Sequence, residues 1–358
     1  MNTITAIHAP WVRCLLAALI AVSLAFSAAP ADACGCGIYI PLEGQASVSE
    51  EHVLIRWDGQ TEDIVMTLGV LGSSKEAAVI FPVPARATVK LGDARLFDEL
   101  RELTKPRIET VYALFPMEFA GGVGARPGAV TLIERQTLGP FDVSTLAASD
   151  VDALGEWLAA NGYNLPPEVT AALEPYVEQG WYYIAVRLSP GAGGEALQGK
   201  LDPLQISFPY DQIVYPMRPS ALAKVPLTVF MYILADHRVM KNQTFGLEHI
   251  QYADWIDPAD LQPGSALAGF VTEKLFLTKI SEQINQPETI DDDYTFVFTP
   301  DDNVYHTVIY RYVYDIAGIP IILLILCSCG LLVLALVSAG LLLLRRRAKR
   351  GQPAAAPG

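Results

Sequence analysis

The chain has 358 residues, and its 25 Lys and Arg stand against 39 Asp and Glu, so the formal net charge at pH 7 is −14. Only one acid and six bases lie outside residues 34–315, which leaves 38 acidic and 19 basic residues in that segment. A segment this acidic repels nucleic acid and anionic lipid, and we expect neither as its partner.

The first 33 residues have the composition of a secretory signal. Arg13 precedes the apolar block Cys14 to Phe26, and small residues follow up to Ala31-Asp32-Ala33. This order of charge, apolar block and Ala-x-Ala predicts a signal peptide over residues 1–33 that is cleaved before Cys34. A lipoprotein signal is a weaker alternative because Asp32 is a poor fit before the cysteine.

Two of the five cysteines, Cys34 and Cys36, are expected in the exported segment. In an oxidising compartment they form a disulfide with each other or between chains, or they bind a soft metal as thiolates. A metal site normally needs three or four ligands, so the disulfide is the preferred interpretation.

The exported segment begins with a strong hairpin pattern. Two apolar runs, Val53 to Trp57 and Thr61 to Leu71, flank the dipeptide Asp58-Gly59, which favours a tight turn between strands. Residues 77–81 predict a third strand. Pro82 and Pro84 are expected to end it, because proline cannot donate to a strand ladder.

A short helix is predicted next. Asp93 has the position of an N-cap, and the spacing of Leu96, Phe97, Leu100 and Leu103 puts these side chains on one helical face.

A helical hairpin is predicted over residues 149–180. Ser149 is the expected cap of its first helix, whose buried stripe contains Leu154 and Leu158. The second helix begins at Pro166-Pro167, and Pro175 is expected to kink or stop it.

Strands account for most of the remainder, by the alternation of apolar residues. The predicted segments are Arg107 to Phe115, Val130 to Leu138, Trp181 to Leu188, Leu204 to Phe208, Leu227 to Leu234, Gly269 to Ile280, Tyr294 to Phe298 and Val304 to Tyr314. The expected fold class is therefore α+β, with a β-rich ectodomain over residues 34–315, an inserted helical hairpin and one transmembrane helix after it. Two β-rich parts, 34–145 and 181–315, joined by the hairpin remain an alternative organisation.

A membrane span is predicted over residues 316–344. This run carries no charged residue, and Arg345, Arg346 and Arg347 follow it directly. Such a length crosses the hydrocarbon layer as a helix, and flanking basic residues stay in the cytoplasm. We expect a single-pass cell-membrane protein with its N-terminus outside and a short basic tail, residues 345–358, inside.

Small residues within the span allow close approach of helices, so self-association through the span is an expected form of partnership. Cys327 and Cys329 also lie in the span. Together with the Arg cluster they leave open processing as a C-terminal sorting signal, although the apolar run begins well before Cys327 and a plain anchor is the preferred interpretation.

No contiguous catalytic motif occurs in the exported segment. His52, His237, His249 and His306 lie apart in sequence without metalloenzyme spacing, and no Gly-x-Ser-x-Gly elbow is present. No cofactor is predicted. Calcium is the one metal hypothesis from carboxylates, through Asp291, Asp292, Asp293, Asp301 and Asp302, although their spacing is not that of an EF-hand.

An ordered set of short motifs resembles a known family. The set comprises Cys34-Gly35, Trp57-Asp58-Gly59, Phe81-Pro82-Val83-Pro84, Trp157-Leu158 with Asn161-Gly162-Tyr163, Gly180-Trp181, and Tyr215-Pro216-Met217-Arg218. It resembles bacterial domain-of-unknown-function family 2330 over residues 34–280. The resemblance implies an extracytoplasmic bacterial protein, often anchored at its C-terminus, and supplies no catalytic residue.

The sequence thus favours a non-enzymatic, membrane-tethered module for binding or envelope scaffolding, with an envelope protein or a second copy of the chain as partner. The alternative is an envelope hydrolase with a non-contiguous active site. Four polar groups clustered around one histidine in a cleft, with a perturbed pKa, would favour the enzyme. Scattered histidines with no such pocket would favour the binding module.

Overall fold

The computed structural model describes residues 38–41, 44–112, 137–138, 141–148, 150–160, 167–188, 197–313, 315–316 and 319–350. The predicted signal peptide, Cys34 and Cys36 lie outside these residues. The chain divides into two compact units. We term residues 1–101 and 128–304 the body, and residues 102–127 and 305–358 the C-terminal unit.

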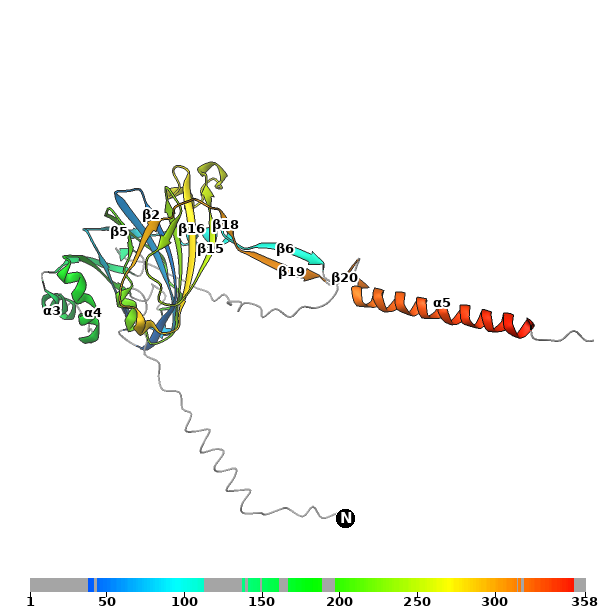
Figure 1. The fold of residues 1–358 in the computed structure, drawn as a ribbon. Helices are drawn as coiled ribbons and strands as arrows, with labels where there is room; N and C mark the ends of the chain where they lie inside the picture. The colour runs from blue at the N-terminus through cyan, green and yellow to red at the C-terminus, as the bar shows by residue number, and fades with distance from the viewer. Residues whose placement is uncertain are drawn as a thin grey trace, which may run out of the picture. The chain divides into compact units, whose positions relative to one another are not determined.

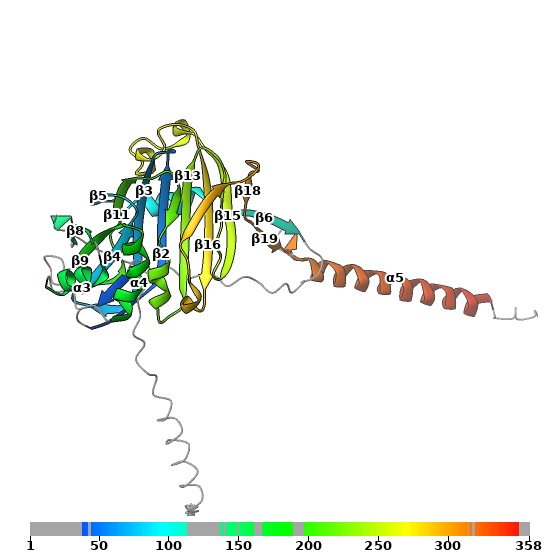
Figure 2. The ribbon, with the colours of Figure 1, turned by 60° about the vertical axis from the view of Figure 1, so that its left-hand side comes forward.

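The body is built on a large twisted sheet, which we term the main sheet (Figure 2). Its strands lie in the order β15-β16-β13-β2-β3-β11-β5, and β10 also pairs with β3. Neighbours are antiparallel except β13 and β2, which run parallel. The bounds are β2 (Gly44–Trp57), β3 (Thr61–Ser74), β5 (Thr88–Leu91), β10 (Leu197–Lys200), β11 (Leu204–Pro209), β13 (Leu227–Ala235), β15 (Leu247–Ile256) and β16 (Leu275–Ile284).

The predicted hairpin between β2 and β3 is confirmed. Gly59 has φ of +89°, a left-handed conformation that glycine adopts without a Cβ clash. The Asp58 carboxylate accepts hydrogen bonds from the backbone N–H groups of Gln60 and Thr61, at 3.1 and 2.8 Å. The turn is therefore closed by local chemistry that the dipeptide alone predicts.

A second sheet packs against the main sheet. Its order is β1-β4-β9-β8-β7, with bounds β1 (Ile38–Pro41), β4 (Ala77–Val83), β7 (Thr137–Leu138), β8 (Phe141–Ala147) and β9 (Tyr182–Leu188). Every residue of β4 is buried. Val79 and Phe81 face the main sheet, and Ala78 and Ile80 face the opposite side. Strands from residues 34–145 and from residues 181–315 are hydrogen-bonded neighbours in both sheets.

The expectation that Pro82 ends its strand is wrong. Pro82 lies within β4 and is paired with Tyr183 of β9. On its other side β4 is paired with β1 only from Ala77 to Ile80. Among the described residues, no strand pairs with that side of β4 beyond Ile80, so the missing N–H of Pro82 interrupts no described ladder there.

The predicted helical hairpin is present as α3 (Val151–Ala160) and α4 (Pro167–Glu178), which cover the free face of the second sheet (Figure 1). Leu154 and Leu158 are buried as expected. Asp150 acts as the cap, since its carboxylate accepts from the N–H of Ala153 at 2.7 Å; Ser149 lies outside the described residues. Pro175 does not stop α4, which continues to Glu178, so the proline lies in the last turn of the helix. Gly180, which follows the helix, has a left-handed conformation that is common after a helix C-terminus.

A small third sheet extends the second layer over the other half of the main sheet. It consists of β12 (Ile213–Tyr215), β17 (Tyr294–Phe298) and β14 (Val239–Lys241), in the order β12-β17-β14. Its apolar side chains join the core between the layers. Short 3₁₀ turns η1 (Arg218–Leu222), η2 (Pro258–Asp260), η3 (Leu267–Gly269) and η4 (Pro287–Thr289) connect the strands.

Helix α2 (Leu96–Leu103) covers the outer face of the main sheet, the face turned away from this core. Leu96, Phe97 and Leu100 are buried, as their spacing predicts. The body is thus α+β and β-rich, which confirms the predicted fold class.

The C-terminal unit contains β6 (Arg107–Tyr112) paired in parallel with β19 (Val308–Val313), the short strands β18 (Tyr305–His306), β20 (Asp315–Ile316) and β21 (Ile319–Pro320), and helix α5 (Ile321–Arg350). The helix begins at Ile321, later than the apolar run, because Pro320 favours the position before a first turn. From Ile322 to Arg346 it is apolar and long enough to cross a membrane, and none of that stretch is buried.

Candidate functional site

The outer face of the main sheet carries a group of basic and aromatic side chains beneath α2, which we term the basic-aromatic cluster: His52, Phe97, Lys200, Tyr232 and Lys279. Strands β2, β13 and β16 are neighbours, and their register places Tyr232 directly opposite Lys279. Helix α2 contributes Phe97, whose ring centroid lies 6.3 Å from that of Tyr232 and 5.8 Å from that of His52.

His52 is held by stacking and by a carboxylate. Its ring stacks on Phe230 at 4.8 Å, and its Nε2 lies 2.6 Å from Oε1 of Glu50. This hydrogen bond lowers the pKa of the Glu50 carboxyl. The other ring nitrogen, Nδ1, is buried and has no hydrogen-bond partner among the described residues.

Two lysines complete the cluster. Lys279 is only 7% exposed, and its Nζ lies 5.3 Å from the centre of the Tyr232 ring. Burial, with a smaller contribution from the Arg101 charge, lowers the pKa of Lys279 to about 8. Burial also lowers the pKa of Lys200, whose Nζ lies 5.2 Å from the centre of the Phe97 ring. The cluster concentrates cationic donors on a body that is otherwise acidic.

In the sequence, His52 is one of four scattered histidines of the exported segment, and neither Lys200 nor Lys279 was predicted as a site residue. A signal was present, because Lys279 interrupts the apolar alternation of residues 275–284 with a charge at a position where a buried strand has none.

A second group of charges is buried on the core side of the main sheet. Lys241 of β14 contacts Glu282 of β16, and its Nζ lies 2.8 Å from Glu248 of β15. Glu282 also accepts hydrogen bonds from the Tyr294 hydroxyl at 2.9 Å and from the N–H of Gly246 at 2.5 Å. The side chains of Lys241 and Glu282 have no exposed area. The charged and polar groups of this cluster are paired with one another across the layers. The cluster therefore joins the small sheet to the main sheet.

Glu62 is a further buried acid on β3. It lies at the start of β3, has no exposed area, and accepts hydrogen bonds from the N–H of Val214 at 3.2 and 3.3 Å. Burial raises the pKa of the Glu62 carboxyl well above its usual range.

The substitution Glu62→Gln is expected to remove part of the pH dependence of stability. The folded pKa is raised, so the carboxyl contributes stability below its unfolded pKa and loses it as pH rises through the folded pKa. The variant should therefore gain stability relative to the wild type between about pH 5 and about pH 8. Urea denaturation at both pH values measures this, and a constant difference between the two proteins would contradict it.

The first acidic run, Asp291 to Asp293, contacts the segment Tyr215 to Arg218. Asp293 Oδ1 accepts hydrogen bonds from the N–H groups of Met217 and Arg218 at 2.7 and 3.0 Å, and from the Tyr176 hydroxyl at 2.6 Å. The Arg218 guanidinium donates to Asp292 at 2.6 Å and to the carbonyl of Asp291 at 2.8 Å. These contacts fix the start of η1 against β17.

The second acidic run, Asp301 and Asp302, closes the turn beside β14. Asp302 accepts from the N–H of Arg238 at 2.8 Å, and its other oxygen lies 2.8 Å from His237 Nδ1. The hydrogen bond with His237 lowers the pKa of the Asp302 carboxyl. Asp301 accepts from the N–H of Asn303 at 3.1 Å.

Within the described ranges, no group of three or more His, Cys, Asp and Glu side chains is arranged to hold a metal ion. The calcium hypothesis on the two acidic runs stays a prediction. Cys327 and Cys329 are exposed thiols on α5, and Arg345, Arg346 and Arg347 lie in its last turns.

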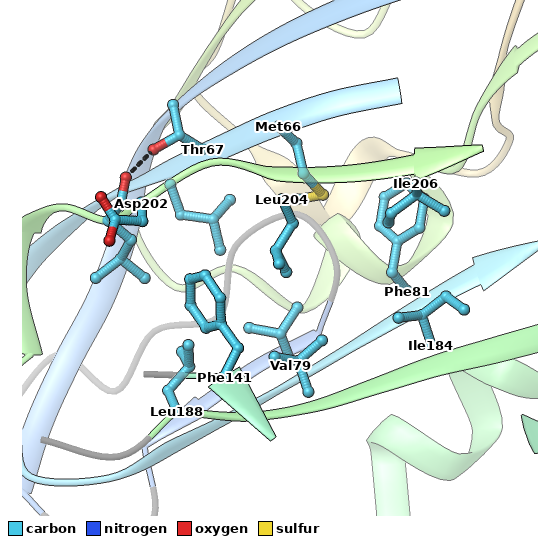
Figure 3. A pocket seen from close by; sticks show the side chains of 13 residues that line it. Met66, Thr67, Val79, Phe81, Phe141, Ile184, Leu188, Asp202, Leu204 and Ile206 are labelled. Carbon is cyan, nitrogen blue, oxygen red and sulfur yellow. Dashed lines mark hydrogen bonds between the residues drawn. The ribbon is translucent and has the colours of Figure 1, made fainter. Parts of the chain in front are cut away.

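A cavity lies between the main and second sheets, lined by apolar side chains that include Met66, Phe81, Phe141 and Ile184 (Figure 3). Its volume is about 20 Å³. That is the space of a water molecule, whereas ligand sites typically enclose about 300–1,000 Å³. The basic-aromatic cluster, and not this cavity, is the candidate functional site.

Comparison with known proteins agrees with the predicted family. No curated protein matches the sequence. One similar solved structure is the crystal structure of baculovirus P35, at 13% identity and a TM-score of 0.39, with 73% of this chain and 99% of that chain covered. A family model described as "Uncharacterized protein conserved in bacteria (DUF2330)" matches residues 30–297. The chain therefore belongs to this family of conserved bacterial proteins.

Proposed function

We propose that the protein is a membrane-anchored binding module of the bacterial cell envelope, held outside the membrane by α5, and that the basic-aromatic cluster is its recognition site. The anchor rests on the apolar, unburied stretch from Ile322 to Arg346, which ends in Arg345 and Arg346. Basic residues after a span stay in the cytoplasm, so the body is placed on the other side.

One observation carries the binding role. Lys279 is 7% exposed, yet it has no hydrogen bond or ion pair with any described residue. Placing a cation in such a position without an anion is costly, and proteins seldom keep it unless it serves a ligand or a reaction. The polar groups of the Lys241 and Asp293 regions, by contrast, meet one another and serve the fold.

A hydrolase is the second candidate. The His52 and Glu50 side chains, 2.6 Å apart, form the histidine-carboxylate pair that orients a general base. Their neighbours are lysines and aromatic rings, which supply cationic donors and contact area. The binding role uses all of these groups, whereas hydrolysis uses the pair alone.

The experiment compares the full-length wild-type protein with His52→Ala and Lys279→Met in membranes. Protease added to intact spheroplasts should digest the body, and crosslinking in intact cells should give adducts with the wild type that both variants lose. A protected body would overturn the location, and equal adducts in all three proteins would overturn the recognition site.

Hydrolysis is measured on the same purified proteins with aryl esters. Turnover by the wild type that is lost in His52→Ala but kept in Lys279→Met would favour the hydrolase over the binding module.

A further inference from the structure

We infer that the basic-aromatic cluster binds an oxyanion, a phosphate or carboxylate group, between Lys200 and Lys279. This inference rests on the proposed function and names the class of group that the module recognises. It follows from the charges of the region, from the way in which they are held, and from the chemistry of ammonium donors.

The charges around the cluster do not balance. Three cations, Lys200, Lys279 and Arg101, lie in this region with two carboxylates, Glu50 and Asp98. Glu50 is hydrogen-bonded to His52 at 2.6 Å, and Asp98 is bonded to Arg101 at 2.8 Å.

Both carboxylates therefore have side chains other than the two lysines as their direct partners. Neither Lys200 nor Lys279 forms a hydrogen bond or ion pair with any residue in the described part of the chain. Glu50 and Asp98 act on Lys200 only at longer range, so both ammonium groups are available to contact an external anion.

The two lysines are held in place by aromatic rings. Lys200 lies over Phe97 and Lys279 lies over Tyr232, and these two rings are themselves in tilted contact. Cation-π contacts fix the positions of the ammonium groups without neutralising their charge. Since Phe97 and Tyr232 are each 1% exposed, the arrangement exists before any ligand arrives.

His52 adds an unpaired ring nitrogen on the same face. Its Nε2 faces Glu50, and its buried Nδ1 has no partner among the described residues. When the ring carries a proton on both nitrogens, Nδ1 donates to an oxyanion beside it. The three groups then provide the point charges and N–H donors that recognise phosphate and carboxylate oxygens.

The lowered pKa of Lys279 agrees with its burial and with the lack of a nearby carboxylate within the described ranges. A buried ammonium without a counter-charge loses its proton more readily, and a bound anion would raise that pKa again. The pKa of Lys200 is lowered mainly by burial, although the charges of Asp98 and Glu50 act in the opposite direction.

The test is calorimetric titration of the full-length protein in detergent, in a chloride buffer, with inorganic phosphate in one arm and acetate in the other. Concentrations up to about 10 mM detect dissociation constants in the millimolar range. We expect binding in at least one arm, and the stronger arm assigns the anion. Lys279→Met and Lys200→Met should each weaken that binding at least about tenfold.

Two further variants make the result specific. Lys279→Arg keeps the charge and should bind within a few-fold of the wild type. Lys274→Met is the matched control, because Lys274 also lies over an aromatic ring, 5.2 Å from the centre of Trp255, but lies outside the cluster. It should bind like the wild type. Thermal melting confirms that each variant is folded.

Two results would overturn the oxyanion assignment: no binding in either arm, or equal binding by the wild type and Lys279→Met. If the crosslinked adducts still depended on Lys279, the proposed function would stand and only the ligand class would be wrong. If neither anion binding nor the crosslinked adducts depended on Lys279, the proposed recognition site would be wrong as well.

Discussion

Lys241→Met is expected to lower the free energy of unfolding by about 3–5 kcal/mol, the usual cost of removing one partner from a buried ion pair. The side chains of Lys241 and Glu282 have no exposed area. Without Lys241, Glu282 keeps only neutral donors, among them the Tyr294 hydroxyl and the N–H of Gly246. These do not balance a charge inside the protein.

Urea denaturation measures this loss of unfolding free energy, and two further variants serve to identify its cause. The double variant Lys241→Met, Glu282→Leu removes the fully buried pair and should recover a large part of the stability, because the carboxylate then left without its lysine is Glu248, whose side chain is 28% exposed. Lys105→Met removes an exposed lysine that is paired with Glu102, and should change stability little. A loss below about 1 kcal/mol for Lys241→Met would show that the pair is not buried in solution.

Asp293→Ala is expected to destabilise the body by about 3 kcal/mol, from the loss of three hydrogen bonds to one carboxylate at roughly 1 kcal/mol or more each. The carboxylate accepts from the N–H groups of Met217 and Arg218 and from the Tyr176 hydroxyl. These donors come from the start of η1 and from α4, so the variant loosens both from β17. The N–H of Met217 and the Tyr176 hydroxyl would remain buried without this acceptor.

Asp291→Ala is the matched control in the same acidic run. Asp291 contacts Arg218 through its backbone carbonyl, which the variant keeps. Its stability should therefore stay close to that of the wild type in the same denaturation experiment. Equal losses for Asp291→Ala and Asp293→Ala would show that the effect comes from the charge of the run and not from these hydrogen bonds.

The elements that short sequence patterns predicted are those held by interactions between residues close in sequence. Asp58-Gly59 sets the first hairpin through a left-handed glycine and a carboxylate that accepts two N–H groups, and both effects act within four residues. Leu154 and Leu158 gave the buried stripe of α3 by their spacing alone. The apolar run after residue 316 and the arginines after it likewise predict α5 without reference to the rest of the chain.

Strand β15 was not predicted, because its sequence mixes polar and apolar residues. Glu248, His249 and Gln251 interrupt the alternation, and a register shift between Ile250 and Tyr252 changes which face each residue occupies. The strand is formed by pairing with β16 and not by an apolar pattern of its own. Pro82 is similar, because its place in β4 depends on pairing with Tyr183 of β9, a strand distant in sequence.

Short motifs, composition and local spacing were enough to predict the family, the β-rich α+β class, the first hairpin, the helical hairpin and the apolar helix near the C-terminus. Which charges meet depends instead on the packing of distant strands. Lys241 and Glu282 are 41 residues apart, and Tyr176 and Asp293 are 117 apart. Strand pairing brings such residues together, and it also leaves Lys279 buried beneath α2 without a carboxylate. A charge's partners and burial are set by the packing of distant strands, which the local pattern around that residue does not encode.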